Sequence, residues 1–161
     1  MKVAGIVKDS VVDGIGIRDV IFLQGCCHQC KGCHNPETWD MKGGTKLNIF
    51  QVGERLKDST NDITISGGEP LLQFNEVLRF MCLTADYSSK RFWLYTGFTF
   101  EEIPREKLLL LSKFVDVLVD GRYEEDKRDL NLLFRGSSNQ RLIDLPKSIQ
   151  EKRIVLWEGY K

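Results

Sequence analysis

Residues 19–33 read DVIFLQGCCHQCKGC, an apolar run that leads directly into four of the five cysteines in this chain of 161 residues. A short run rich in β-branched and aromatic residues is typical of a buried strand. Thiolates are soft ligands that suit zinc or iron–sulfur clusters. The stretch therefore predicts a strand at residues 19–23, followed by a loop that binds a metal centre.

Four further runs of this kind are expected to be strands, at residues 62–66, 91–95, 115–119 and 153–157. Between the first four strands, apolar residues at helical spacing, or a proline in the first turn, predict helices at residues 48–58, 74–87 and 104–114. Cys82, within the second helix, is expected in the core. The alternation predicts an α/β fold with a parallel sheet and right-handed crossovers, either layered or an incomplete barrel.

Residues with distinctive chemistry follow each of the first four predicted strands. The cysteines follow the first strand, and the sequence GGEP at residues 67–70 follows the second. Thr96 and Gly97 follow the third strand, and Asp120 with Arg122 offers charge after the fourth. Because ligands bind at the carboxyl ends of parallel strands, we expect these residues to form one site.

The overall composition indicates a folded protein in a reducing compartment. Hydrophobic residues make up 42% and charged residues 29%, with 23 basic and 23 acidic side chains. This balance gives no positive field for nucleic acid, and the longest aliphatic run, at residues 108–111, is too short to cross a membrane. The first residues lack the apolar region of a secretory signal, so we expect a cytoplasmic protein with free thiols.

A disulfide and a zinc site are the simplest alternatives for the cysteine group. The expected compartment disfavours a structural disulfide. A closed zinc site needs four ligands, and His28 or His34 could join Cys30 and Cys33. The second, distant pair of ligands that most zinc modules supply is missing from the sequence.

The spacing of the cysteines also disfavours a ferredoxin-type site. Such a site would use Cys27, Cys30 and Cys33, but the position of the fourth ligand is Glu37. The remaining pattern is C-x3-C-x2-C on Cys26, Cys30 and Cys33, which resembles the radical S-adenosylmethionine superfamily. In that superfamily three thiolates bind three irons of a [4Fe–4S] cluster and leave the fourth iron open.

This resemblance implies an incomplete (β/α) radical-type barrel in a single domain over residues 1–161, with the cluster loop at residues 24–35. It implies that S-adenosylmethionine chelates the open iron through its amino and carboxylate groups. The GGEP motif would bind the methionine part, with the Glu69 carboxylate paired to the ammonium group. The residues implied to bind the cofactor are Gly32, His34, Gly67, Gly68, Glu69 and Thr96.

Four longer motifs resemble the activating enzymes of glycyl radical enzymes. They are VDGIGIR at residues 12–18, CHNPETW at 33–39, VDVLVDG at 115–121 and RGSSNQR at 135–141. The pyruvate formate-lyase activating enzyme shares the first two motifs but is longer. The activating proteins of anaerobic ribonucleoside-triphosphate reductase are about this short and resemble the chain over residues 6–145, so they are the favoured family.

The favoured family implies a reaction that begins with one electron from a low-potential donor such as reduced flavodoxin. Cleavage of S-adenosylmethionine gives methionine and a 5′-deoxyadenosyl radical, which removes hydrogen from a glycine of the reductase. No side chain is needed as an acid or base. Docking of the reductase implies an exposed apolar patch around Phe92, Trp93, Phe98 and Phe100, although most of these four aromatic residues are themselves expected in the core. A non-catalytic zinc-binding module and a radical enzyme acting on a small molecule remain the alternatives.

Overall fold

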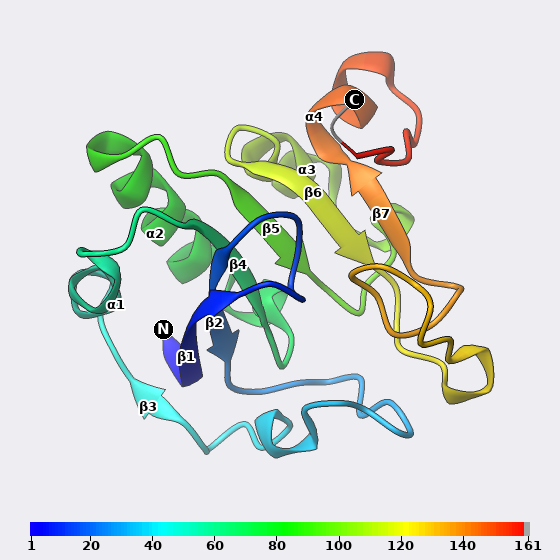
Figure 1. Ribbon diagram of the computed structural model, residues 1–161, viewed down its shortest axis with the longest axis horizontal. Helices are drawn as coiled ribbons and strands as arrows, with labels where there is room; N and C mark the ends of the chain where they lie inside the picture. The colour runs from blue at the N-terminus through cyan, green and yellow to red at the C-terminus, as the bar shows by residue number, and fades with distance from the viewer. Residues whose placement is uncertain (160–161) are drawn as a thin grey trace.

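A twisted sheet of seven strands forms the centre of the computed structural model, which describes residues 1–159 (Figure 1). The strands lie in the order β3-β1-β2-β4-β5-β6-β7. Their bounds are Lys2–Ser10 for β1, Arg18–Leu23 for β2, Thr45–Lys46 for β3, Asp62–Gly67 for β4, Phe92–Tyr95 for β5, Val115–Asp120 for β6 and Arg141–Asp144 for β7.

The four middle strands run parallel, and the strands at both edges run antiparallel to their neighbours. β2, β4, β5 and β6 pair in parallel, whereas β1 and β3 on one side and β7 on the other are antiparallel. The register places Leu23 of β2 beside Gly67 of β4, so these two strands end together. The expected α/β fold is confirmed as a mixed, mostly parallel sheet that matches an incomplete barrel.

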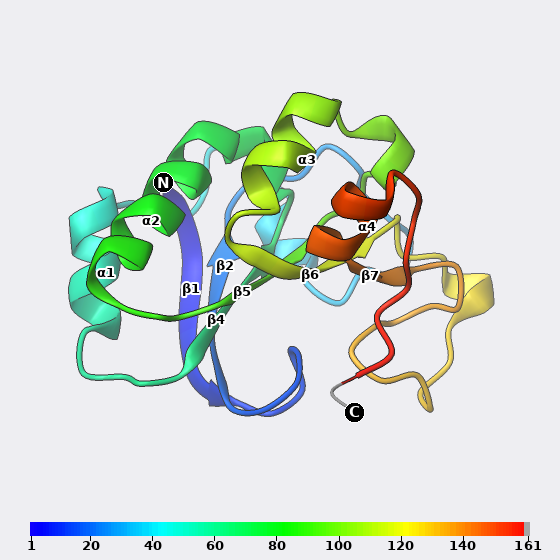
Figure 2. The ribbon, with the colours of Figure 1, turned by 90° about the horizontal axis from the view of Figure 1, so that it is seen from above.

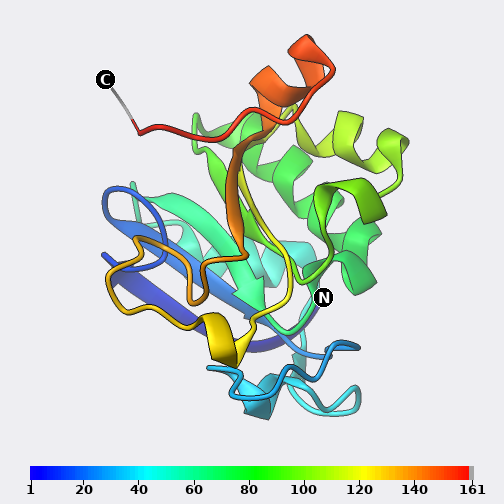
Figure 3. The same ribbon diagram turned by 90° about the vertical axis from the view of Figure 1, so that its right-hand side faces the viewer.

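All four helices cover the same face of the sheet (Figure 2). They are α1 (Ile49–Leu56), α2 (Phe74–Tyr87), α3 (Arg105–Leu111) and α4 (Leu145–Glu151). Their apolar sides and the strands enclose one large core that includes Ile65, Phe80 and Leu118, each nearly inaccessible to solvent. The opposite face of the sheet carries no α-helix among the described residues, and the long loop between β6 and β7 extends on that side (Figure 3).

The sequence predicted the first four parallel strands and three helices, but not the edges of the sheet. The segment at residues 153–157 is not a strand: Leu156 forms only an isolated bridge with Ile143. The strand that follows β6 in the sheet is β7 instead. It was not predicted, because it lies in a segment rich in charged and turn residues. Cys82 is exposed instead of buried, because Phe80 and Met81 occupy the inner face of α2.

The motif at residues 12–18 serves the fold. Arg18 is buried, and its guanidinium donates to the Thr64 hydroxyl at 2.7 Å and to the Ile63 carbonyl at 2.8 Å. The same group lies over the Trp93 ring, 5.5 Å from its centre. Thr64 in turn donates to the Asp13 carbonyl, so the β1–β2 turn is fixed against the open face of the sheet.

No helix among residues 1–159 is long and apolar enough to span a membrane.

Candidate functional site

The carboxyl ends of the parallel strands open into a cavity of about 690 Å³. Sites for small molecules usually measure roughly 300–1,000 Å³, so a nucleoside-sized ligand fits. The wall includes Cys26, Cys30 and Cys33 from the loop after β2. The loop between β6 and β7 lies beside this cysteine loop at the same end of the sheet (Figure 3). The geometry therefore brings the loops after the parallel strands to one cavity, although not every residue expected there lines it.

The cysteine loop is held in place by the segment that follows it. The Gly25 amide donates to the Thr38 carbonyl at 2.7 Å, and the Cys26 amide donates to the Trp39 carbonyl at 3.2 Å. The buried side chain of Gln24 donates to two further carbonyls of the same segment. The CHNPETW motif thus closes the loop back onto the end of β2, which explains why these residues accompany the cysteines.

Backbone amides lie near the three thiols that line the cavity. The Asn35 amide donates to the Cys33 sulfur at 3.4 Å. Backbone groups of His28 and Gln29 near Cys26, and of Tyr123 near Cys30, favour the thiolate and oppose the effect of burial on the pKa of these two thiols. Hydrogen bonds to sulfur are one of the means by which a protein sets the reduction potential of an iron–sulfur cluster.

The thiols differ in exposure. Cys26 is buried, Cys30 and Cys33 are half-buried, and Cys27 is exposed and lies outside the cavity wall. Burial raises the pKa of Cys26 and of Cys30 above that of an ordinary thiol. A metal binds the thiolate, so loading of this site must release protons from these cysteines.

The glycine pair after β4 packs directly against the cysteine loop. The Gly68 amide donates to the Leu23 carbonyl at 2.8 Å, and the Glu69 amide donates to the Gly25 carbonyl at 2.7 Å. A Cβ atom at Gly68 would lie only 2.2 Å from the Gly25 carbonyl oxygen. Only glycine allows this approach, which brings the cavity wall formed by Gly67 and Gly68 next to the thiols.

Glu69 is fully buried, and its carboxylate is saturated by donors from the protein. One oxygen accepts from the Leu71 amide at 2.9 Å, and the other from the Gly97 amide at 2.9 Å and from His28 Nε2 at 2.8 Å. The Thr96 hydroxyl lies within 3.0 Å of both oxygens. The carboxylate therefore joins the ends of β4 and β5 to the cysteine loop, and it is not part of the cavity wall.

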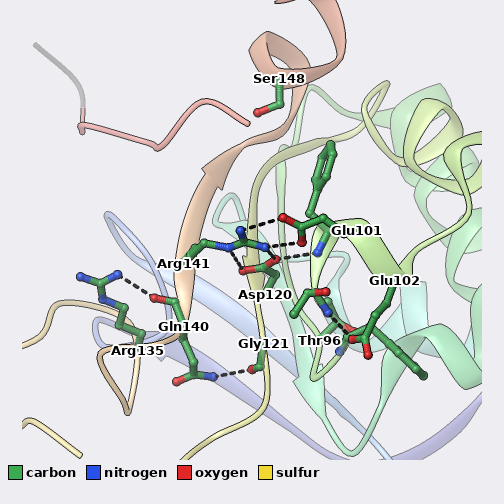
Figure 4. A network of polar contacts seen from close by, with 12 residues as sticks. Thr96, Glu101, Glu102, Asp120, Gly121, Arg135, Gln140, Arg141 and Ser148 are labelled. Carbon is green, nitrogen blue, oxygen red and sulfur yellow. Dashed lines mark hydrogen bonds and ion pairs between the residues drawn. The ribbon is translucent and has the colours of Figure 1, made fainter. Parts of the chain in front are cut away.

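Asp120, expected to offer charge to a ligand, is instead used inside the fold (Figure 4). Its carboxylate accepts from the Phe100 amide at 2.7 Å and from Arg141 Nε at 3.0 Å. Arg141 also binds Glu101 through both carboxylate oxygens and lowers the Glu101 pKa to about 2. Arg122, two residues after Asp120, does line the cavity.

The β6–β7 loop supplies residues that sequence analysis missed. The Tyr95 hydroxyl donates to the Phe134 carbonyl at 2.7 Å, and the Phe134 ring packs edge-on against Trp93. Tyr123, Leu130, Leu132, Leu133 and Phe134 line the cavity together with Val11 and Val12 of the β1–β2 turn. The sequence did contain a signal for these residues: leucines stand in an otherwise polar segment, directly before the RGSSNQR motif.

Nine residues were predicted to bind the cluster or the cofactor, and seven of them line the cavity: Cys26, Cys30, Cys33, His34, Gly67, Gly68 and Thr96. The other two do not line it: Gly32 is exposed elsewhere on the loop, and Glu69 is buried beneath the wall. The Glu125 carboxylate occupies the space next to Gly32, within 2.8 Å of where a Cβ atom would stand. Of the four aromatic residues considered for an apolar patch, Phe92 and Trp93 are buried in the sheet, as expected for most of them, and Phe98 and Phe100 are half-buried.

Comparison with known proteins agrees with this geometry. The family model of the "4Fe-4S single cluster domain" matches residues 12–143. The chain is 38% identical to the anaerobic ribonucleoside-triphosphate reductase-activating protein of Enterobacteria phage T4 over 138 residues, 81% of this chain and 86% of that protein. The chain belongs to the family of anaerobic ribonucleoside-triphosphate reductase-activating proteins. The proteins of the same name from Escherichia coli (strain K12) and Haemophilus influenzae are 34% and 33% identical, over 90% and 89% of their lengths.

Membership of this family resolves the choice between metals in favour of a [4Fe–4S] cluster over zinc. Among residues 1–159, no three His, Cys, Asp or Glu side chains converge on the position of a single ion. The three thiols line a larger cavity instead. This suits a [4Fe–4S] cluster, in which each thiolate binds a different iron. The donor set fits the group: three soft sulfur ligands, an amide that donates to the Cys33 sulfur, and a glycine-lined wall beside them.

Proposed function

We propose that this chain is an activating enzyme for an anaerobic ribonucleoside-triphosphate reductase, and that it cleaves S-adenosylmethionine reductively at a [4Fe–4S] cluster. Cys26, Cys30 and Cys33 would hold three irons, and the cluster would supply one electron to the sulfonium. This chemistry would break the bond from sulfur to C5′ and give methionine and a 5′-deoxyadenosyl radical, which would take a hydrogen atom from a glycine of the reductase and leave the unpaired electron there.

One observation carries this proposal: the three cysteines of the C-x3-C-x2-C pattern line a single cavity, while the neighbouring Cys27 does not. A set of three ligands leaves one iron without a protein donor, and an open metal position is where a ligand is activated. The wall at Gly67 and Gly68 lies next to the thiols and is the proposed site of the methionine group.

The residues of the chain bind and orient the reactants and need not move protons. His34, Thr96 and Arg122 line the cavity with polar groups that can bind the ribose or the carboxylate of the cofactor. Val11 and Val12 line the same cavity and are largely exposed, so they give it an apolar edge that is open to solvent.

The mouth of the cavity supports a protein substrate. Four aliphatic side chains, which we call the apolar rim, line the cavity and are 65–83% exposed: Val11, Val12, Leu130 and Leu133. Exposed apolar groups next to a site commonly mark a surface for another protein. We propose that the rim receives the glycine-bearing segment of the reductase, and that a low-potential donor such as flavodoxin delivers the electron.

Three measurements on anaerobically reconstituted protein test the proposed function. We expect about four irons and four sulfides per chain, as a cubane cluster requires. The reduced protein should convert S-adenosylmethionine to methionine and 5′-deoxyadenosine, and added reductase should acquire a glycyl radical signal. Zinc in place of iron without cleavage, or turnover of a small molecule with no reductase present, would contradict the proposal.

The apolar rim gives a separate prediction. Leu130→Ser combined with Leu133→Ser removes two exposed leucines, each contributing roughly 1.5–3 kcal/mol when buried in a complex. The reductase concentration that gives half-maximal activation should therefore rise at least tenfold, measured by the yield of glycyl radical. Leu109→Ser with Leu110→Ser is the matched control, because these leucines are exposed on α3. Equal concentration dependence for the two double variants would refute the role of the rim.

A further inference from the structure

His28 links the cysteine loop to two other strand ends, and it belongs neither to the three predicted cluster ligands nor to the residues predicted to bind the cofactor. Its side chain is 5% exposed, and it lies in the loop between Cys26 and Cys30. Nε2 lies 2.8 Å from the Glu69 carboxylate after β4, and Nδ1 lies 3.2 Å from Arg122 Nε after β6. The ring thus bridges two segments that are far apart in the sequence.

The partners of His28 define its tautomer. Arginine has only donors, so Arg122 Nε donates and Nδ1 accepts. Nε2 then carries the hydrogen and donates to Glu69. Each ring nitrogen therefore has a specific partner, which fixes the rotation of the ring as well as its position.

The space around the ring is equally restricted. The Phe98 ring meets it edge-on, with 4.6 Å between the ring centres. A Cβ atom at Gly97 would lie 2.3 Å from Cδ2 of His28, so the absence of a side chain there creates the slot for the imidazole. The side chain of His28 is therefore fixed by its contacts with Gly97 and Phe98 and by one hydrogen bond on each ring nitrogen.

We propose that His28 is a positioning residue that clamps the cysteine loop onto the glycine-rich end of β4. The inference rests on the proposed function. Backbone bonds from Gly68 and Glu69 hold the loop at Leu23 and Gly25, and the His28 side chain makes the next contact to the same segment. The clamp sets the distance between the thiols and the cavity wall where the methionine group would bind. Glu69 acts through this contact, from behind the wall.

Two amide variants separate the contributions of the two hydrogen bonds that the His28 ring makes, one with Glu69 and one with Arg122. The amide nitrogen of Gln can reach the place of Nε2, so His28→Gln keeps the bond to Glu69. Asn reaches only the place of Nδ1, so His28→Asn keeps the bond to Arg122 and loses the bond to Glu69. We expect His28→Ala and His28→Asn to raise the dissociation constant for S-adenosylmethionine about tenfold, because a bond to a charged group is lost. His28→Gln should remain within about threefold of the unmodified protein.

Gly97→Ala provides a test that leaves His28 itself unchanged. The added methyl group displaces the imidazole, so the variant should weaken binding of S-adenosylmethionine to the same extent as His28→Ala. If Gly97→Ala acts through His28, it should have no additional effect in a His28→Ala background. Additive losses would show instead that the methyl group obstructs the cavity directly, and would refute the coupling.

The measurements are iron content, equilibrium binding of S-adenosylmethionine, and the change that it causes in the electron paramagnetic resonance spectrum of the reduced cluster. Lys31→Ala, in the same loop and exposed, is the control and should match the unmodified protein. Iron should be retained in all variants, while the spectral change is reduced in His28→Asn and restored in His28→Gln. Equal behaviour of Asn and Gln overturns the clamp. Failure of the unmodified protein to respond would instead overturn the proposed function.

Discussion

Cys30→Ala is expected to abolish cluster binding, whereas Cys27→Ala should leave it largely intact. Cys30 faces the cavity with Cys26 and Cys33, and loss of one of three thiolates leaves two irons without a protein ligand. Cys27 is exposed and lies outside the cavity wall. Iron and acid-labile sulfide per chain, measured after anaerobic reconstitution of both variants, check the prediction.

The two neighbouring alanine variants control for each other, since each removes one sulfur from the same loop. Retention of about four irons by Cys30→Ala together with loss of iron from Cys27→Ala would reverse the ligand assignment. Loss in both variants would indicate that Cys27 also contributes to the site, which its exposure does not lead us to expect.

Glu69→Ala is expected to have the second largest effect, on both stability and cofactor binding. The carboxylate is buried and accepts from two backbone amides, the Thr96 hydroxyl and His28. Removing it leaves these donors without an acceptor, which costs roughly 3 kcal/mol or more. For a chain of this size the melting temperature should fall by roughly 10 °C.

Thermal unfolding and binding of S-adenosylmethionine should therefore change together in Glu69→Ala, while iron is still bound. Glu54→Ala is the control, because this glutamate is largely exposed on α1 and should change the free energy of unfolding by less than about 0.5 kcal/mol. A Glu69→Ala protein as stable as the control, with cofactor binding alone weakened, would favour direct contact between the carboxylate and the ammonium group.

The central strands and the location of the site could be predicted because their signals are local. β2, β4, β5 and β6 are short apolar runs, and each is followed by the residues that distinguish it. The cysteine spacing alone selected three of the four clustered thiols, and the cavity wall contains those three. Parallel strands place their carboxyl ends together, so the order of the loops along the chain was enough to predict where the site lies.

The remaining features depend on contacts that sequence patterns do not reveal. β7 is an edge strand within a charged segment, and its Arg141 is paired with Asp120 and Glu101 instead of with solvent (Figure 4). Asp120 and Glu69 were expected at the ligand because both follow strands. Each carboxylate instead accepts hydrogen bonds from segments that are distant in the sequence, and only the folded structure identifies those donors. The apolar rim was missed because its residues come from two loops that are distant in the sequence and meet only in the folded structure.

The most direct test concerns the open iron on which the account depends. The reduced protein would be studied by low-temperature electron paramagnetic resonance and electron–nuclear double resonance, with and without S-adenosylmethionine labelled with 15N at its amino group. We predict a changed spectrum on addition and a hyperfine coupling between the cluster and the labelled nitrogen, because chelation brings that nitrogen onto an iron. An unchanged spectrum without coupling would contradict the account, as would a fourth amino-acid ligand on the cluster.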